Sequence, residues 1–322
     1  MSQAFVSTPL HGAPRALLAT GRWELPTDLD AVGCDRTRTG AVARRGPGPV
    51  VRRAEPGTGG PLVLEAWAGN GNTTVRVWGS PDTPPAEADA AVEAGAAWVG
   101  LRDDPSPLDD LAAADRRIAT LAQEVGWWPR LGRLPRVTEA IGRAVPAQLV
   151  QSVEAHRSIA QFASATGVAA GDLTAWPTAA TVRATPDWTF RRCGMSTRGA
   201  RSLRAAAAEE PRLVRAAGDW RQFDARVTAL PGIGAWTSAE ARGALGDPDA
   251  VSVGDYNLPG LVGHVLAGDR FADDGAMLEL LAPFTGQRGR VIRLILMAVS
   301  RRVVAPPGRR APRARLSAHR YW

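Results

Sequence analysis

Residues 230–258 read L-P-G-I-G-A-W-T-S-A-E-A-R-G-A-L-G-D-P-D-A-V-S-V-G-D-Y-N-L. Gly232 and Gly234 permit the positive φ angles of a tight turn and leave bare backbone for a ligand to approach. The small and polar residues that follow predict a helix, so free N–H groups and the positive end of a helix dipole converge at one place. An anion such as a phosphate group is the partner that this geometry favours.

A single carboxylate follows at the end of this stretch. Asp255 comes after the short apolar run Val251-Ser-Val-Gly254, where folding does not require a carboxylate, and this placement indicates a charge kept for chemistry. The alternative is a helix cap, because Tyr256-Asn-Leu258 forms a first helical turn and aspartate is a preferred N-cap residue. The position alone favours the cap, whereas the glycine turn at this distance upstream favours a functional carboxylate.

Arginine supplies the positive charge of the chain. The 322 residues include 39 basic and 32 acidic residues, a net charge of +7, and no lysine. A GC-rich genome would bias the composition in this way, yet arginine is always charged and its planar fork matches phosphate. A nucleic acid is therefore favoured over a membrane. No apolar run approaches the roughly 20 residues of a membrane span, and no export signal begins the chain, so we expect a cytoplasmic protein.

The glycine turn and its aspartate resemble those of the helix-hairpin-helix DNA glycosylase superfamily, in the branch of DNA-3-methyladenine glycosylase II. The matching residues are Leu230, Pro231, Gly232, Ile233, Gly234, Trp236, Thr237, Val253, Gly254, Asp255 and Leu258. The resemblance covers about residues 146–300 well and the N-terminal third loosely. It implies an α+β fold, in which a mainly helical helix-hairpin-helix core carries a smaller N-terminal antiparallel β-rich domain.

The resemblance also assigns roles to individual residues. Asp255 would be the catalytic carboxylate, which stabilises positive charge on the sugar or activates water. The base pocket would contain Trp236, Glu240 and Gln151. The DNA phosphate would contact the hairpin and a neighbouring basic side chain, namely Gly232, Ile233, Gly234, Thr237 and Arg198.

Glu240 departs from the best-known members of the family, in which this position is aromatic. It lies four residues after Trp236 and hence on the same helical face. A flipped base that carries positive charge would stack on Trp236 and be attracted to Glu240. The alternative is that Glu240 pairs with Arg242 or Arg293.

The residue that fills the gap left by a flipped base is open. Relatives carry a Gln-x-Val element near the lesion, and Gln151-Ser152-Val153 matches it, but Ser152 is too short to act as a wedge. Either Leu149 or Val150 supplies the wedge, or the DNA is distorted less than in relatives. The alternative for Leu149 and Val150 is a place in the core.

The implied activity is that of a monofunctional DNA glycosylase, a monomer that acts on double-stranded DNA with damaged bases and is associated with the bacterial nucleoid. Without lysine, the chain cannot form the lysine Schiff base of glycosylases that also cut the strand. Cys34 and Cys193 are too few for a four-thiolate iron–sulfur cluster. No cofactor or side-chain metal site is expected, although the resemblance implies a monovalent cation at the hairpin carbonyls.

The type of base that is removed is inferred from the lack of a proton donor near the hairpin. His264 is interpreted as structural, and no histidine or lysine lies near the hairpin, so a base already made cationic by N-alkylation is favoured. The first rival is a non-catalytic helix-hairpin-helix DNA-binding protein. The second is a glycosylase for neutral oxidised or deaminated bases, which would need an acid.

The chain divides into four predicted parts. Residues 1–20 lack periodicity and are expected to be mobile, residues 21–105 form the β-rich domain, residues 106–304 form the glycosylase domain, and the basic tail 305–322 attracts DNA. Strands are predicted at 61–67 and 72–78, joined at Gly69-Asn70-Gly71. Helices are predicted at 86–99, 107–125, 137–144, 147–166 with Pro146 in the first turn, 236–245 and 289–304. Arg198, Arg201 and Arg204 recur on one helical face, which either binds DNA or is merely solvated.

Overall fold

The computed structural model describes residues 16–25, 29, 40–45, 48–126, 129–148, 150 and 152–308. The strands are β1 (Ala16–Trp23), β2 (Gly40–Arg45), β3 (Gly48–Glu55), β4 (Leu62–Gly69), β5 (Asn72–Gly79), β6 (Val168–Ala170) and β7 (Leu173–Ala175). The α-helices are α1 (Pro85–Trp98), α2 (Pro107–Ala114), α3 (Arg116–Val125), α4 (Val137–Ala144), α5 (Ser152–Thr166), α6 (Ala179–Ala184), α7 (Asp187–Arg192), α8 (Thr197–Ala216), α9 (Trp220–Thr228), α10 (Ala235–Ala244), α11 (Leu258–Ala267), α12 (Asp274–Leu281) and α13 (Arg288–Ser300), with 3-10 turns η1 (Val145–Ala147) and η2 (Ala282–Phe284). The predicted α+β class is confirmed.

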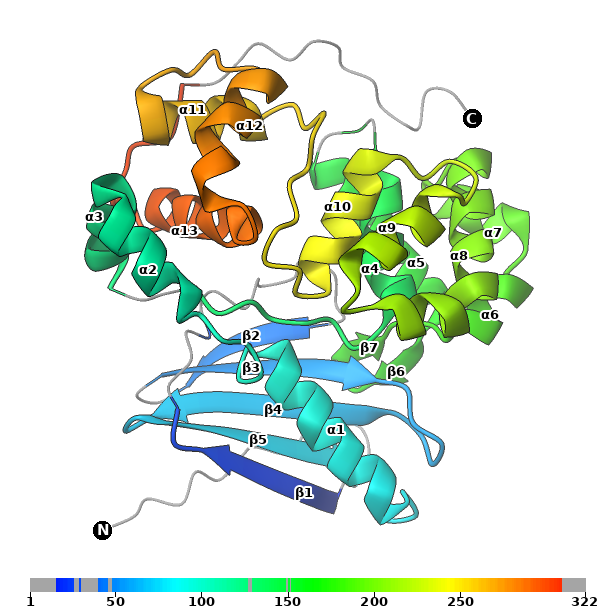
Figure 1. Ribbon diagram of the computed structural model, residues 1–322. Coiled ribbons are helices and arrows are strands. Elements are labelled where there is room, and N and C mark those ends of the chain that lie inside the picture. The colour runs from blue at the N-terminus through cyan, green and yellow to red at the C-terminus, as the bar shows by residue number, and fades with distance from the viewer. Residues whose placement is uncertain are drawn as a thin grey trace.

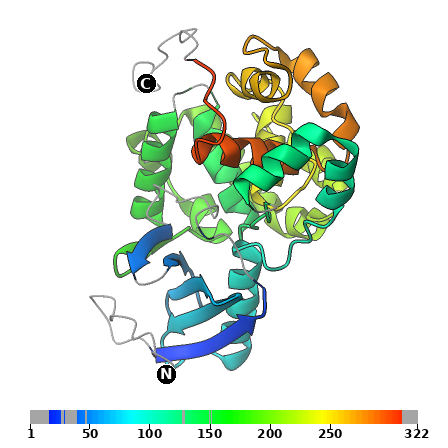
Figure 2. The ribbon, with the colours of Figure 1, turned by 90° about the vertical axis from the view of Figure 1, so that its left-hand side faces the viewer.

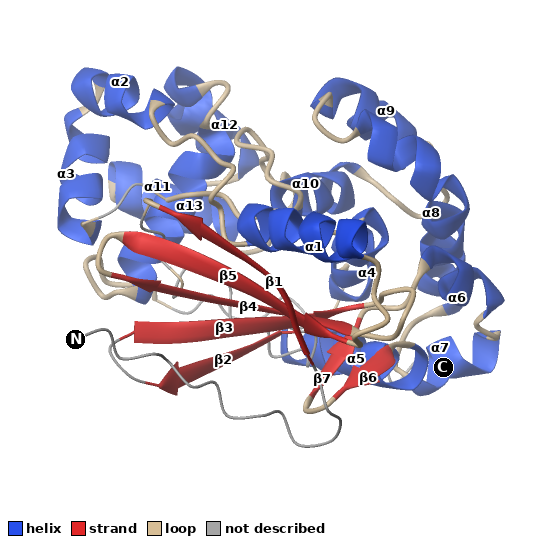
Figure 3. Ribbon diagram, turned by 90° about the horizontal axis from the view of Figure 1, so that it is seen from below, coloured by secondary structure: helices blue, strands red, loops and turns tan. Residues whose placement is uncertain are grey.

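An antiparallel five-stranded sheet of order β1-β5-β4-β3-β2 forms the N-terminal part and lies below the helices in Figure 1. The predicted hairpin joins β4 to β5, where Asn70 and Gly71 have φ angles of 52° and 75°, as a tight two-residue turn requires. Helix α1 lies across the strands (Figure 3) and packs on one face, where Leu64 and Val77 are fully buried. Side chains alternate along a strand, so Val63 points to the opposite face, where it packs against the β6–β7 hairpin.

The helices other than α1 form two groups (Figure 1 and Figure 2). One core joins α2 and α3 to the C-terminal helices α11, α12 and α13, and the others are built from α4 to α10. The first group therefore combines segments that are far apart in the sequence. The chain passes from the second group to the first between α10 and α11, and this connection carries Asp255.

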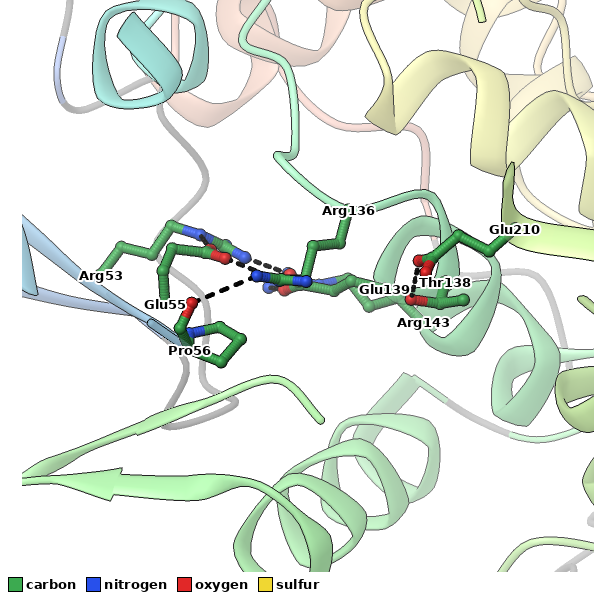
Figure 4. Close-up of polar contacts among 8 residues, drawn as sticks. All are labelled: Arg53, Glu55, Pro56, Arg136, Thr138, Glu139, Arg143 and Glu210. Carbon is green, nitrogen blue, oxygen red and sulfur yellow. Dashed lines mark hydrogen bonds and ion pairs between the residues drawn. The ribbon is translucent and has the colours of Figure 1, made fainter. Parts of the chain in front are cut away.

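A buried ionic network ties the sheet to the second group of helices (Figure 4). Arg53 on β3 bonds both Glu55 and the fully buried Glu139 on α4, while Arg143 and Arg136 bond the same two carboxylates from the other side. Burial by itself raises the pKa of Glu139, but the charges and hydrogen bonds of Arg53 and Arg143 lower it below the ordinary value. Because α4 packs against α10, the network fixes the helix that follows the glycine turn.

Several boundaries differ from those predicted. Residues 16–20, assigned to a mobile segment, belong to β1, and the single helix predicted at 107–125 divides at Asp115, whose side chain caps α3 by accepting the N–H of Arg117 at 2.8 Å. Pro146 lies in η1, so α5 begins at Ser152, and α13 ends at Ser300. Residues 1–15 and most of the predicted tail lie outside the described residues.

Candidate active site

The glycine turn joins α9 to α10, so the predicted helix-hairpin-helix is present. The N–H of Ile233 donates to the Leu230 oxygen at 3.2 Å and closes the turn. Gly232 has a φ of 77°, but Gly234 has a φ of −108° and a ψ of −175°, which is extended backbone. The prediction of positive φ at both glycines was therefore wrong for Gly234. This residue is the N-cap of α10, and a Cβ built on it would meet nothing within 4 Å, so its backbone is open to a ligand.

Two side chains from other elements hold the turn in place. Ser202 on α8 donates its hydroxyl to the Pro231 oxygen at 2.7 Å. The side-chain amide of Gln148 donates to the Gly232 oxygen and to the Thr237 hydroxyl, each at 2.9 Å. These bonds attach the turn to the segment that precedes α5.

The residues predicted to bind phosphate lie together around this turn. A Cβ at Gly232 would lie 3.2 Å from the Arg198 Nε, and the Arg198 side chain is exposed. Thr237 is 2% exposed and Ile233 is 5% exposed, so both residues are buried next to the turn. Phosphate contact by these five residues remains a prediction.

The two carboxylate oxygens of Asp255 bond different partners. The indole Nε1 of Trp236 donates to Oδ2 at 3.2 Å, whereas Oδ1 accepts the backbone N–H groups of Asn257 and Leu258, each at 2.8 Å. The carboxylate thus bonds the start of α11, which is a contact of the kind that the helix-cap alternative predicts. Because each oxygen serves one purpose, these two bonds fix the orientation in which Oδ2 faces Trp236.

Glu240 lies in the same site, one turn after Trp236. The hydroxyl of Ser252 donates to Oε1 of Glu240. Arg242, one of its two predicted partners, instead bonds Asp247 at 2.7 Å. The Glu240 side chain is exposed to solvent, but the surrounding protein still desolvates it, which raises its pKa; the charge of Asp255 raises the pKa further, and the Ser252 bond opposes both.

Of the three wedge candidates, the structure describes Val150 and Ser152. Ser152 is exposed at the first position of α5, and Val150 is half-buried. Leu149 and Gln151 lie outside the described residues, so their roles remain predictions.

Gln148 is the residue that the sequence analysis missed. The signal was available, because Gln148-Leu149-Val150 is a second Gln-x-Val tripeptide three residues before the one chosen. The two bonds from Gln148 to the glycine turn favour the first tripeptide as the match to the family element.

Two other residues from the sequence analysis make local contacts. Arg204 pairs with Asp187 at 2.5 Å and donates to the Thr185 oxygen at 2.6 Å, so it does not extend the exposed surface of Arg198 and Arg201. His264 bonds the Ala305 oxygen at 3.0 Å, as its structural interpretation predicts.

Among the residues that the structure describes, no group of three or more histidine, cysteine, aspartate or glutamate side chains is placed to hold a metal ion. None of the helices described is long and apolar enough to cross a membrane.

Comparison with known proteins identifies the fold. No protein-family model and no curated sequence matches the chain. A 3-methyladenine DNA glycosylase from Archaeoglobus fulgidus is similar in structure, with a TM-score of 0.73 and 20% identity over 88% of this chain and 99% of that one.

Two further solved structures share the architecture. A 3-methyladenine DNA glycosylase from Schizosaccharomyces pombe, in complex with abasic DNA, has a TM-score of 0.51 and 20% identity over 60% of this chain and 96% of that one. An 8-oxoguanine glycosylase/lyase from Clostridium acetobutylicum, with double-stranded DNA, has a TM-score of 0.57 and 12% identity over 82% and 99%. The chain therefore has the fold of the helix-hairpin-helix DNA glycosylases, as the sequence predicted.

Proposed function

We propose that this chain, with its helix-hairpin-helix glycosylase fold, is a monofunctional DNA glycosylase. It hydrolyses the N-glycosidic bond of N-alkylated purines that are flipped out of duplex DNA, which is the first step of base excision repair. The solved structures of similar fold that hold DNA support a DNA partner. The absence of lysine supports base removal without lysine-dependent strand cleavage.

The observation that carries this proposal is the contact between Trp236 and Asp255. The indole presents a flat aromatic surface immediately beside a carboxylate, and both lie next to the glycine turn. A base stacked on Trp236 would place its sugar near Asp255. Breakage of the glycosidic bond builds positive charge on that sugar, and a carboxylate about 4 Å away attracts it by on the order of 4 kcal/mol at an effective dielectric constant near 20. This attraction corresponds to roughly a thousandfold in rate.

The glycine turn would hold the DNA. The first turn of α10 leaves backbone N–H groups without partners inside the helix, at its positive end. Gly234 leaves this end uncovered, and the exposed Arg198 lies beside Gly232, two residues earlier in the turn. A phosphate group satisfies both the N–H groups and the arginine.

Cationic purines are the favoured substrates because their leaving group is already activated. An N-alkylated base such as 7-methylguanine leaves as a neutral molecule and needs no proton. Trp236 supplies an aromatic face for it, since a cation is attracted to an indole ring.

The experiment compares wild type with Asp255→Asn on methylated duplex DNA and measures the released bases. Asparagine keeps an oxygen for the backbone N–H groups of Asn257 and Leu258, so the start of α11 should persist. We expect base release to fall by about a hundredfold or more, with DNA affinity retained. Asp273→Asn is the matched control, because Asp273 caps α12 and lies outside the proposed site. Equal release by wild type and Asp255→Asn would show that the carboxylate has been misassigned.

The rival function is non-catalytic DNA binding. The two bonds from Asp255 to the start of α11 favour it, since they give the carboxylate a purpose without chemistry. Wild-type protein that binds methylated duplex DNA but releases no base would support the rival and exclude the enzyme.

A further inference from the structure

Glu240 shares the site with Asp255 but has no part in the reaction described so far. It stands one helical turn after Trp236 on the same face of α10, so a base stacked on the indole would lie within reach of its side chain. Ser252 bonds Oε1, and the side chain is exposed, so the second oxygen has access to a ligand. The carboxyl group is therefore held in place at one oxygen and available at the other.

Charged groups on the neighbouring elements are occupied with one another. On α10, Arg242 bonds Asp247 and stands 3.7 Å from Asp224 of α9, whose carboxylate also accepts the Ser238 hydroxyl. On α4, which packs against α10, Glu139 and Arg143 bond each other. In the connection to α11, Asp249 pairs with Arg288. The negative charge of Asp255 acts on Glu240 and raises its pKa.

The two carboxyl groups consequently have different environments. Asp255 accepts hydrogen bonds from three N–H donors. Glu240 has one hydroxyl partner and the negative charge of Asp255 nearby, and with the desolvation described above it keeps a proton to higher pH than an ordinary glutamate. Paired carboxyl groups in contrasting environments typically divide the acid and base roles between them.

We propose that Glu240 is a general acid that donates a proton to the departing base, so that the site also removes neutral purines such as hypoxanthine. This inference rests on the glycosylase function proposed above. It supplies the acid that a neutral leaving base requires and that the sequence did not reveal.

The reaction balances as a hydrolysis. The proton of Glu240 passes to a ring nitrogen of the flipped purine as the C1′–N9 bond breaks, and the bonding electron pair stays with the base. Water adds to C1′ and gives its proton to Asp255, which releases it to solvent. Glu240 regains a proton from solvent through its exposed side, and the products are the free purine and an abasic sugar.

The test measures single-turnover release of hypoxanthine and of 7-methylguanine from matched duplexes by wild type, Glu240→Gln and Glu279→Gln, from about pH 5 to pH 8. Glu279 is an exposed residue on α12 and serves as the matched control. Glutamine keeps the size of Glu240 and an oxygen for Ser252, but it cannot donate a proton to the base. We expect Glu240→Gln to lower hypoxanthine release by about a hundredfold, as general acids typically contribute, and 7-methylguanine release by less than about threefold.

The pH dependence distinguishes an acid from a merely structural residue. Wild-type hypoxanthine release should decline as the pH rises through the pKa of Glu240, and this decline should be missing in Glu240→Gln. An ionised Glu240 that attracts cationic bases gives the opposite preference, in which the variant loses 7-methylguanine release first. That preference, an equal loss of both bases, or wild-type release of 7-methylguanine without hypoxanthine would overturn the general acid alone. Release of neither base by wild type would overturn the glycosylase function and the inference with it.

Discussion

The side-chain amide of Gln148 donates to the backbone oxygen of Gly232 across 84 residues of sequence, at 2.9 Å. The same nitrogen reaches the Thr237 hydroxyl at the start of α10. The segment that leads into α5 is thus attached directly to the proposed phosphate-binding turn, and movement of one is passed to the other.

Replacement of Gln148 by leucine should loosen this attachment. The Gly232 oxygen loses its partner, at a cost of roughly 1–3 kcal/mol, and part of that cost should appear as displacement of the turn. We expect affinity for duplex DNA to fall about tenfold, because 1.4 kcal/mol corresponds to a factor of ten. Fluorescence anisotropy with a labelled duplex measures this. Gln123→Leu, at an exposed glutamine on α3, should change nothing, and an unchanged affinity in Gln148→Leu would mean that the turn holds its shape without the bond.

The two glycines of the turn should respond differently to alanine. Gly232 has a φ of 77°, and a Cβ there would lie 2.5 Å from the Ser202 hydroxyl, so Gly232→Ala should lower the free energy of unfolding by roughly 1–3 kcal/mol. Gly234 is extended and faces open space, so Gly234→Ala should fold with almost unchanged stability. Its methyl group would stand where a phosphate approaches, and DNA affinity should therefore fall. Urea unfolding and DNA binding, measured on both variants, check the contrast; a stability loss in Gly234→Ala equal to that in Gly232→Ala would contradict it.

The buried network between the sheet and α4 should make stability depend on pH. The pKa of Glu139 is lower in the folded protein than in the unfolded chain, so the unfolded chain binds more protons and acid favours unfolding. The contribution of ionised Glu139 is present above its unfolded pKa and is lost as the pH falls through its folded pKa. Glu139→Gln should cost roughly 3–5 kcal/mol near neutral pH, because it leaves Arg53 buried with one carboxylate fewer.

Urea unfolding at a series of pH values measures both effects. The matched control is Glu93→Gln, whose partner Arg102 is on the surface and whose own side chain is 57% exposed, so its loss should cost less than about 1 kcal/mol. Equal costs for the two variants, or an unaltered acid dependence in Glu139→Gln, would show that the buried network does not stabilise the fold.

The sequence was most informative where local geometry decides the structure. The turn at Gly69-Asn70-Gly71 and the turn at Gly232 require conformations that few residues adopt, and both were located correctly. The end of the helix predicted at 236–245 was located for the same reason, since Gly246 follows it with a φ of 90°. A local backbone conformation depends on the residues at that position, so it can be recognised from the sequence without knowledge of the fold.

The features of the fold and of the site that were not predicted depend on contacts between segments that are far apart in the sequence. Nothing near Gln148 indicates that its amide will meet Gly232, and the choice between Gln148 and Gln151 needed that contact. Glu240 was interpreted as a charged group for cationic bases because its distance from Asp255 and its desolvation are properties of the folded chain. Strands β1 and β3 were missed because they pair through the sheet and show little alternation of their own.

The two helical groups have separate hydrophobic cores, and this separation affects how the protein can change during evolution. Trp236 lies on α10, which packs in the core of the middle helices through Ala241, while Val251 and Val253, which precede Asp255, pack with α11 and α13. Substitutions that repack the C-terminal core would shift the carboxylate and leave the indole and the glycine turn where they are. Substitutions in the C-terminal core can therefore alter the chemistry while the core of the middle helices keeps the glycine turn in place.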